Sequence, residues 1–216
     1  MTNPGAAENI MYPKPTYEQS LALPGFENIN RYWDKSRGIY GAKILPGEFY
    51  VTMHDELIST VLGSCISACV RDKKLGLGGM NHFMLPASGG EELMGAANRY
   101  GNFAMENLIN EILKNGGRRS NLEVKIFGGG KILATMTDIG LRNIQFAQEY
   151  VKTENLTVIS EDVGDVFPRK VIYFPATGKA LVKRLKSLHN GTVVSRERDY
   201  MSKLDTKPVE SDIELF

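Results

Sequence analysis

A cysteine and a histidine stand 17 positions apart in the chain, Cys65 and His82, and together they could act as a nucleophile and its base. A thiol attacks only as the thiolate, so a reactive cysteine needs a neighbouring base or cation. If residues 65–71 and 76–84 form antiparallel strands around a turn at Asp72–Lys74, Cys65 and His82 lie side by side as a catalytic dyad. The alternative is that Cys65 packs in the core as a small apolar residue.

Small residues surround the candidate nucleophile. Gly63 and Ser64 precede Cys65 and leave room for a substrate, and their backbone N–H groups are the natural donors to an oxyanion. A second glycine run, which includes Gly128 and Gly129, follows an apolar segment. It has the spacing of neither common phosphate-binding motif, so it is either a close-packed backbone turn or part of a site lining.

The other cysteine and histidines have no comparable context. Cys69 is expected in the core, and His54 and His189 at the surface. A chain with two cysteines and three histidines would need nearly all of them for a structural zinc site, so we predict no metal. No cofactor is expected either.

Composition excludes several classes of protein. The chain has 216 residues, 42% hydrophobic and 24% charged, with 26 Lys and Arg against 25 Asp and Glu. The near-zero net charge argues against nucleic-acid binding, which needs surplus cations facing phosphates. No apolar stretch approaches the ~18 residues of a membrane span, and Met1–Ile10 does not read as a secretory signal. We expect a cytoplasmic protein with reduced thiols and, for want of an exposed apolar stripe, a monomer.

Periodicity divides the chain into three parts. Residues 1–40 hold four prolines and are expected to form an irregular arm, residues 41–187 the body, and residues 188–216 a polar tail without a helical period. The cationic run from Lys179 to Lys186 is either a solvated strand face or a docking surface for an acidic partner. The short acidic-apolar stretch at 210–216 is either solvated tail or docking peptide.

The body is predicted to be α+β. Strands are expected at 43–54, broken by a turn, and at 57–62, 66–71, 75–85, 122–127, 156–160, 170–174 and 179–185. The spacing of Ala97, Ala104, Leu108 and Ile112 predicts a helix that begins near residue 91 and ends at Gly116. A second helix is expected from a cap at 138 to about residue 150. Because the strands do not alternate regularly with helices, an α+β sandwich is favoured over a doubly wound parallel sheet.

Two signatures resemble those of the CheD family, the chemoreceptor glutamine deamidases of bacterial chemotaxis. They are the segment Ser59–Cys65, which ends in LGSC, and the segment Gly78–Pro86, GGMNHFMLP. The likeness extends over roughly residues 41–187. It continues through Arg99–Gly101, Phe127–Gly129, Ile139–Asn143 and Glu161–Gly164.

The resemblance implies a three-layer α/β sandwich with mixed sheets and two main helices, related to the deamidase domain of cytotoxic necrotizing factor toxins. It assigns catalysis to Cys65 and His82, with a third residue, a hydroxyl, shortly before the cysteine. Ser59 and Thr60 both fit that position, and the choice between them stays open. Asn81, Gly128 and Gly129 are expected to line the site.

The implied reaction converts a glutamine side chain of a methyl-accepting receptor into glutamate, with release of ammonia through a Cys65 thioester. The implied partners are the receptor's cytoplasmic helical bundle and a CheC-type phosphatase. One alternative is a docking module for receptors or for such a phosphatase. The others are a thiol acyl hydrolase or methylesterase and a transglutaminase, which would use the same cysteine.

Overall fold

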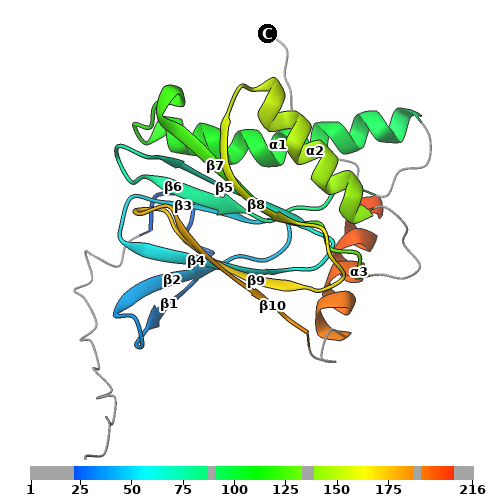
Figure 1. Cartoon of the computed structure of the whole chain (residues 1–216), viewed down its shortest axis with the longest axis horizontal. Helices are drawn as coiled ribbons and strands as arrows, with labels where there is room; N and C mark the ends of the chain where they lie inside the picture. Colours follow the sequence, from blue (N-terminus) through cyan, green and yellow to red (C-terminus); the bar gives the residue numbers. More distant parts are fainter. Residues whose placement is uncertain (1–21, 87–90, 133–138, 187–190, 207–216) are drawn as a thin grey trace, which may run out of the picture.

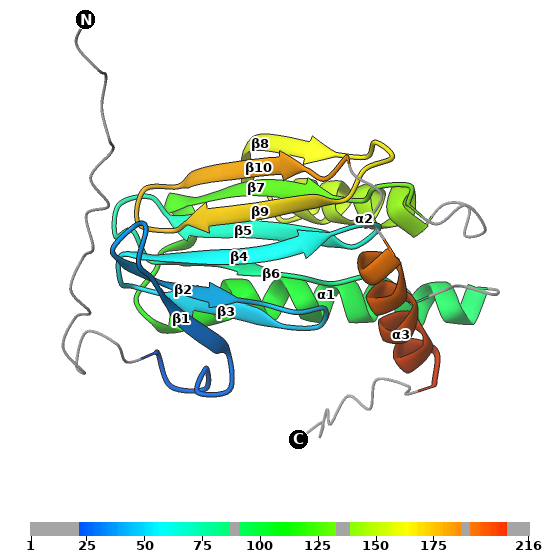
Figure 2. The ribbon, with the colours of Figure 1, turned by 90° about the horizontal axis from the view of Figure 1, so that it is seen from below.

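Two β-sheets and a helical layer make up the body of the protein (Figures 1 and 2). The structure is a computed structural model that describes residues 22–86, 91–132, 139–186 and 191–206. The two sheets pack face to face, and two long helices cover the outer face of one of them. The layers are therefore helix, sheet and sheet, and the mixed α+β class predicted from the sequence is confirmed.

The first sheet has the strand order β1-β2-β4-β9-β10. All its neighbours are antiparallel except β2 and β4, which are parallel. Its strands are β1 (Asn30–Asp34), β2 (Ile39–Lys43), β4 (Glu56–Leu62), β9 (Arg169–Phe174) and β10 (Lys179–Arg184). Strand β9 alternates buried and outward residues, with Val171 and Tyr173 inward and Lys170 exposed, as expected where one face meets the core and the other meets solvent.

The second sheet has the order β3-β6-β5-β7-β8, with β7 and β8 parallel and the other pairs antiparallel. Its strands are β3 (Phe49–Thr52), β5 (Ile66–Asp72), β6 (Gly78–Asn81), β7 (Leu122–Gly128) and β8 (Thr157–Val163). Strand β5 lies at its centre, between the first sheet and the helices. Six of its seven residues are buried, as expected for a strand covered on both faces.

The helical layer consists of α1 (Glu91–Lys114) and α2 (Ile139–Thr153), and the 3-10 turn η2 (Arg119–Asn121) follows α1. Helix α1 buries Met105, Leu108 and Ile112 at spacings of three and four residues, against β3, β5 and β6. It ends before Gly116, whose φ of 99° suits a helix terminus. A third helix, α3 (Gly191–Thr206), lies across one end of the sandwich (Figure 2).

The chain changes sheets several times in its first half. It leaves the first sheet after β2, enters the second at β3, returns at β4 and leaves again for β5. The β4–β5 crossing consists of Gly63, Ser64 and Cys65. This short link carries the candidate nucleophile, so the crossing fixes Cys65 at the end of the sandwich.

Most elements expected in the body are present, including the β9–β10 hairpin, in which Phe174 is paired with Lys179. The expectation of an irregular arm up to residue 40 was wrong, because β1 and the start of β2 lie there. Within this hairpin Trp33 stacks edge-on against Tyr40. A contact distant in sequence, the ion pair of Arg31 with Glu56 on β4, ties β1 to the rest of the sheet.

The expectation that residues 188–216 lack helical structure was also wrong, since α3 occupies Gly191–Thr206. Its inward face has a 3–4 residue spacing, with Glu197 and Met201 buried. A charged residue interrupts the apolar stripe, which is why the period is hard to see. The expected cap at position 138, and the stretch at 210–216, lie outside the described residues.

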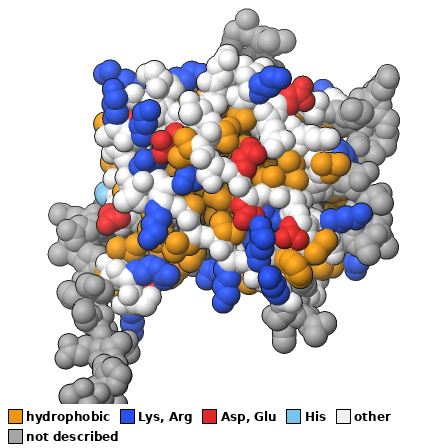
Figure 3. Space-filling view, in the orientation of Figure 1, with side chains coloured by type: hydrophobic (Ala, Val, Ile, Leu, Met, Phe, Trp, Pro, Cys, Tyr) orange, Lys and Arg blue, Asp and Glu red, His pale blue; other side chains and the backbone are white. Residues whose placement is uncertain are grey.

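The surface carries mixed charge. On the face drawn in Figure 3, basic and acidic side chains are interspersed with apolar ones. Arg184, from the cationic run, lies within ion-pair distance of Asp162 and Asp165. None of the helices in the described ranges is both long and apolar enough to cross a membrane.

A buried carboxylate ties the β5–β6 turn to the start of β7. Asp72 Oδ1 accepts hydrogen bonds from the backbone N–H groups of Lys74 and Leu75 (2.8 and 3.1 Å). Oδ2 accepts from Arg118 N–H and Asn121 Nδ2 (2.9 and 3.1 Å). Burial raises the pKa of Asp72, but these hydrogen bonds outweigh it and bring the pKa to about 2.

We predict that Asp72→Ala lowers the free energy of unfolding by about 2–4 kcal/mol, because four donors, three of them partly buried, lose a buried charged acceptor. The measurement is urea denaturation at pH 7, with Asp55→Ala in an exposed turn as the control. Since the folded pKa lies below the unfolded one, the stabilisation is present above about pH 4 and is lost as the pH falls through 2. An effect as small as that of Asp55→Ala would contradict the stabilising role of the Asp72 hydrogen bonds.

Candidate functional site

The crossing loop Gly63–Cys65 is held by its carbonyl groups. In chain order, its three carbonyl oxygens accept hydrogen bonds from Gly130 N–H (2.7 Å), Asn143 Nδ2 (2.8 Å) and Gly129 N–H (2.7 Å). In a trans peptide unit the carbonyl of one residue and the N–H of the next point in opposite directions. The N–H groups of Ser64 and Cys65 therefore point away from the groups that hold the carbonyls of Gly63 and Ser64, toward the side chains of the site.

The glycine run after β7 permits this attachment. Gly128 has a φ of 116°, and a Cβ there would lie 2.2 Å from the carbonyl oxygen of Cys65. Only glycine tolerates both that conformation and that approach. The run is thus a close-packed backbone turn, and Gly129 also lines a neighbouring pocket.

His82 follows directly after β6 and is almost fully buried. Its backbone extends the ladder between β6 and the segment before β3: its N–H donates to Glu48 O (2.9 Å), and its carbonyl accepts from Gly47 N–H (2.8 Å). The backbone of the histidine is therefore fixed on both sides, and its ring faces the first sheet.

The ring of His82 is oriented by a hydroxyl. Its Nδ1 lies 2.7 Å from Thr60 Oγ1, which also lies 2.9 Å from Ile44 O. A hydroxyl has one proton, and a carbonyl can only accept, so Thr60 donates to Ile44 and accepts from a protonated Nδ1. The neutral imidazole then carries its lone pair on Nε2, which has no hydrogen-bond partner among the described residues.

The neighbouring hydroxyl points elsewhere. Ser59 Oγ makes a long contact of 3.4 Å with Ala42 O and is not bonded to the histidine. Because side chains alternate along a strand, only one of two consecutive residues of β4 can face His82. Of the two candidates from the sequence, the geometry brings Thr60 to the ring.

A third ionisable side chain lies beside the pair. A ligand atom of Cys65, one of His82 and one of Glu197 from α3 lie within 4.8 Å of one another, and all three residues are buried. Glu197 Oε1 accepts from the N–H of Gly63 (2.8 Å) and of Cys65 (3.3 Å). Oε2 accepts from Ser64 N–H (2.8 Å) and Ser64 Oγ (2.7 Å).

Both members of the Cys65–His82 pair are uncharged in this arrangement. Burial, followed by the charge of Glu197 and a hydrogen bond to it, raises the pKa of Cys65 well above its ordinary value. Burial, with a smaller effect from the Arg196 charge, lowers the pKa of His82 to about 3. At neutral pH the site therefore holds a thiol and a neutral imidazole.

Thiolate, imidazole and carboxylate are also ligands that zinc accepts. In this structure, however, both oxygens of Glu197 already accept hydrogen bonds from the loop. The carboxylate is satisfied without an ion. The arrangement suits acyl chemistry at Cys65, with His82 as base and the loop N–H groups as donors to negative charge.

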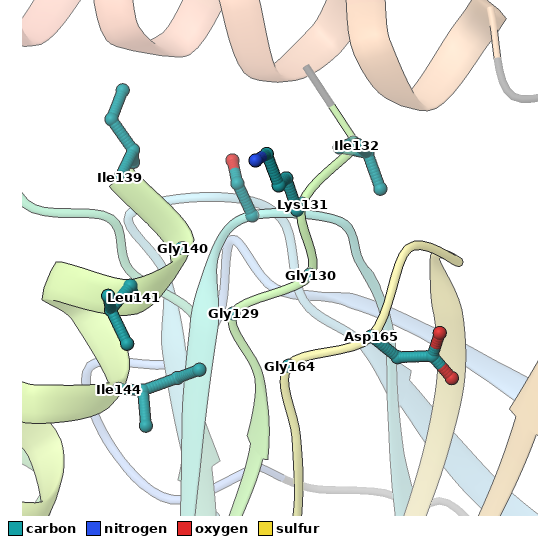
Figure 4. A pocket seen from close by; sticks show the side chains of 11 residues that line it. Gly129, Gly130, Lys131, Ile132, Ile139, Gly140, Leu141, Ile144, Gly164 and Asp165 are labelled. Carbon is teal, nitrogen blue, oxygen red and sulfur yellow. The ribbon is translucent and has the colours of Figure 1, made fainter. Parts of the chain in front are cut away.

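A pocket of about 260 Å³ adjoins the loop and lies beneath α3 (Figure 4). It reaches the crossing at Ser64, while Cys65 and His82 remain buried behind it. Its other lining residues are Gly129, Gly130, Lys131, Ile132, Ile139, Gly140, Leu141, Ile144, Gly164 and Asp165.

Not every residue expected at the site is there. The side chain of Asn81 accepts from Ala68 N–H (2.7 Å) and donates to Ala104 O (3.0 Å), so it joins β5 to α1 and does not line the pocket. It precedes His82 on an extended segment, so the two side chains point in opposite directions. Cys69 is buried in β5, as expected, and His54 is partly exposed. His189 lies outside the described residues.

Two residues were missed by the sequence analysis. Asn143 was noted only as part of the family likeness, yet it holds Ser64 O and accepts from Leu85 N–H (2.9 Å). Glu197 was assigned to a polar tail. Its signal was present: Val193, Glu197, Tyr200 and Leu204 recur at helical spacing, which places a lone acid in an otherwise apolar stripe.

Comparison with known proteins is consistent with the signatures. The family model described as "CheD chemotactic sensory transduction" matches residues 84–184. The chain is 56% identical over 200 residues to a curated "Probable chemoreceptor glutamine deamidase CheD" from Halorhodospira halophila, covering 90% of this chain and 93% of that protein. A relative of the same name from Hahella chejuensis is 53% identical over 199 residues, covering 91% and 94%. One from Dechloromonas aromatica, named CheD 1, is 52% identical over 202 residues, covering 93% and 98%.

The hydrogen-bond pattern predicts the state of the histidine. We expect His82 to be the neutral Nδ1–H tautomer at pH 7 and to stay neutral until the pH approaches about 3. Two-dimensional ¹H–¹⁵N NMR of the imidazole nitrogens measures both properties. In Thr60→Val the preference for Nδ1–H should weaken, because its acceptor is gone. An Nε2–H tautomer, or titration near about 6.5, would contradict the assignment.

Proposed function

The chain belongs to the CheD family, and we propose that Cys65 and His82 perform its glutamine deamidation on a chemoreceptor. The reaction is the hydrolysis of a side-chain carboxamide to a carboxylate and ammonia, in chemotaxis. The observation that carries the assignment is the Thr60–His82 contact. It directs the basic Nε2 of a buried imidazole away from Thr60, within a cluster that also contains the Cys65 thiol.

Each step follows from these groups. His82 Nε2 accepts the thiol proton, and Cys65 Sγ attacks the carboxamide carbon of the substrate. The negative charge that develops on the carboxamide oxygen is stabilised by the N–H groups of the crossing loop Gly63–Cys65. His82 returns the proton to the departing nitrogen, and ammonia leaves behind a glutamyl thioester.

Water completes the cycle. His82 accepts a proton from a water molecule, which attacks the thioester and releases glutamate, and the Cys65 thiolate is reprotonated. Thr60 touches no reacting atom in this scheme; it is a positioning residue that keeps Nδ1 protonated. The product differs from the substrate by one negative charge on a receptor helix, which can shift the balance between two packed states of a helical bundle.

Several expectations belong to the same proposal. The helix–sheet–sheet layering supports kinship with the deamidase domain of cytotoxic necrotizing factor toxins. We further propose that the protein works as a monomer in the cytoplasm, where the receptor's signalling bundle lies, and that it can dock on a CheC-type phosphatase.

The proposed reaction can be tested directly. Incubation with a receptor cytoplasmic fragment should convert glutamines to glutamates, seen by mass spectrometry as a gain of about 1 Da per site. Cys65→Ala and His82→Ala should abolish conversion, while Cys69→Ala should retain it. A product crosslinked to lysine would indicate transglutamination instead. Binding without conversion by any variant would leave a docking function.

The roles of the Thr60 and Ser59 hydroxyls can be separated by substitution. Thr60→Val should reduce kcat about 10- to 100-fold with little change in KM, because the imidazole loses its preferred tautomer. Thr60→Ser should restore most of the rate, and Ser59→Ala should stay within about threefold of wild type. The measurement is kcat and KM as a function of pH. Equal losses in Thr60→Val and Ser59→Ala would argue for a general packing effect.

A further inference from the structure

Glu197 is held in the site as a bound ligand would be. Its carboxylate accepts hydrogen bonds from all three N–H groups of the crossing loop, at 2.8, 2.8 and 3.3 Å, and one from Ser64 Oγ at 2.7 Å. A buried carboxylate is costly unless it is fully hydrogen-bonded, and here the loop meets that need. The same N–H groups are the donors that the proposed reaction requires for its oxyanion.

Helix α3 is anchored so that this side chain enters the site. Arg196 donates to Val61 O at the end of β4 (2.7 Å). The hydroxyl of Tyr200 is hydrogen-bonded to that of Tyr100 on α1, and Met201 is buried in the core. The helix thus contacts both the first sheet and the helical layer, and it runs above the pocket (Figure 4).

As a consequence, Cys65 and His82 are shielded from solvent. Cys65 has an exposed fraction of 0% and His82 of 1%, so no substrate reaches the sulfur while α3 is docked. The negative charge of Glu197 also works against the thiolate, since it raises the pKa of Cys65.

The side chain of Glu197 matches the product of the proposed reaction. Deamidation of glutamine yields a glutamate side chain, and Glu197 is a glutamate side chain presented by a helix. A catalytic role for Glu197 fits less well. His82 is already oriented by Thr60 through Nδ1, and the carboxylate oxygens are taken up by the loop and Ser64.

We propose that α3 is a built-in inhibitor whose Glu197 occupies the glutamine site as a product mimic, and that a receptor helix must displace it. This inference rests on the proposed function, because it identifies the occupant by the product of that reaction. The contacts of α3 then outline the groove that a substrate helix would use.

The sharpest test converts the mimic into a substrate. In Glu197→Gln, the Cys65 sulfur should attack the new carboxamide carbon, ammonia should leave, and water should hydrolyse the thioester to restore glutamate. Peptide mass spectrometry should find position 197 gaining about 1 Da. The double variant Glu197→Gln/Cys65→Ala should retain the amide. Gln145 and Gln148, exposed on α2 in the same chain, serve as internal controls and should stay unchanged.

A second test measures the accessibility of Cys65 and does not rely on deamidation. Alkylation of Cys65 by iodoacetamide should be at least about 10-fold faster in Glu197→Ala and in Tyr200→Ala than in wild type. Arg198→Ala, on the exposed side of α3, should behave as wild type. Circular dichroism and Tm should show that each variant is folded. If the receptor fragment is a substrate, its deamidation should rise in Glu197→Ala.

The outcomes separate this inference from the proposed function. Receptor conversion by wild type, with a stable amide at position 197 and unchanged alkylation, would overturn the inhibitor and leave the function. Conversion at position 197 without receptor conversion would support the occupant and overturn the receptor as substrate. A loss of receptor conversion in Glu197→Ala, with unchanged alkylation, would mean that Glu197 positions the catalytic groups.

Discussion

The crossing of the chain between the two sheets at Gly63–Cys65 is the constraint on which the site depends. The link is only three residues long, and all its carbonyl groups are held from one side by Gly129, Gly130 and Asn143. Because a trans peptide unit directs its N–H away from its carbonyl, the N–H groups of Ser64 and Cys65 face the opposite side. One short segment therefore carries both the candidate nucleophile and the proposed donors to negative charge.

The histidine and the hydroxyl that orients it come from different sheets. Thr60 lies on β4 of the first sheet, and His82 follows β6 of the second. Their contact exists only because the sheets pack face to face, so the tautomer of the histidine is a consequence of the sandwich.

The charges around Cys65 do not favour its reactive thiolate form. Glu197 is a buried anion balanced by N–H dipoles, and next to it a charged thiolate would be repelled. Burial, and after it the charge of Glu197, raises the pKa of Cys65, and burial, with a smaller effect of Arg196, lowers the pKa of His82, so both groups are neutral. In the proposed reaction a neutral carboxamide takes the place of the carboxylate, which removes this repulsion and leaves the donors in place.

The sequence by itself predicted the α+β class and the main strands and helices of the body, because those depend on periodicity and turns. Local spacing suggested Cys65 and His82 as a pair but left a core role for Cys65 open, and the family resemblance made the assignment. The sequence did not distinguish Ser59 from Thr60 as the third residue of the site, since the choice depends on which face of β4 meets the second sheet. It misread β1 and α3, because both are stabilised by contacts with distant segments. Glu197 came from a segment assigned to a polar tail, and only the tertiary structure decided that it lies beside Cys65.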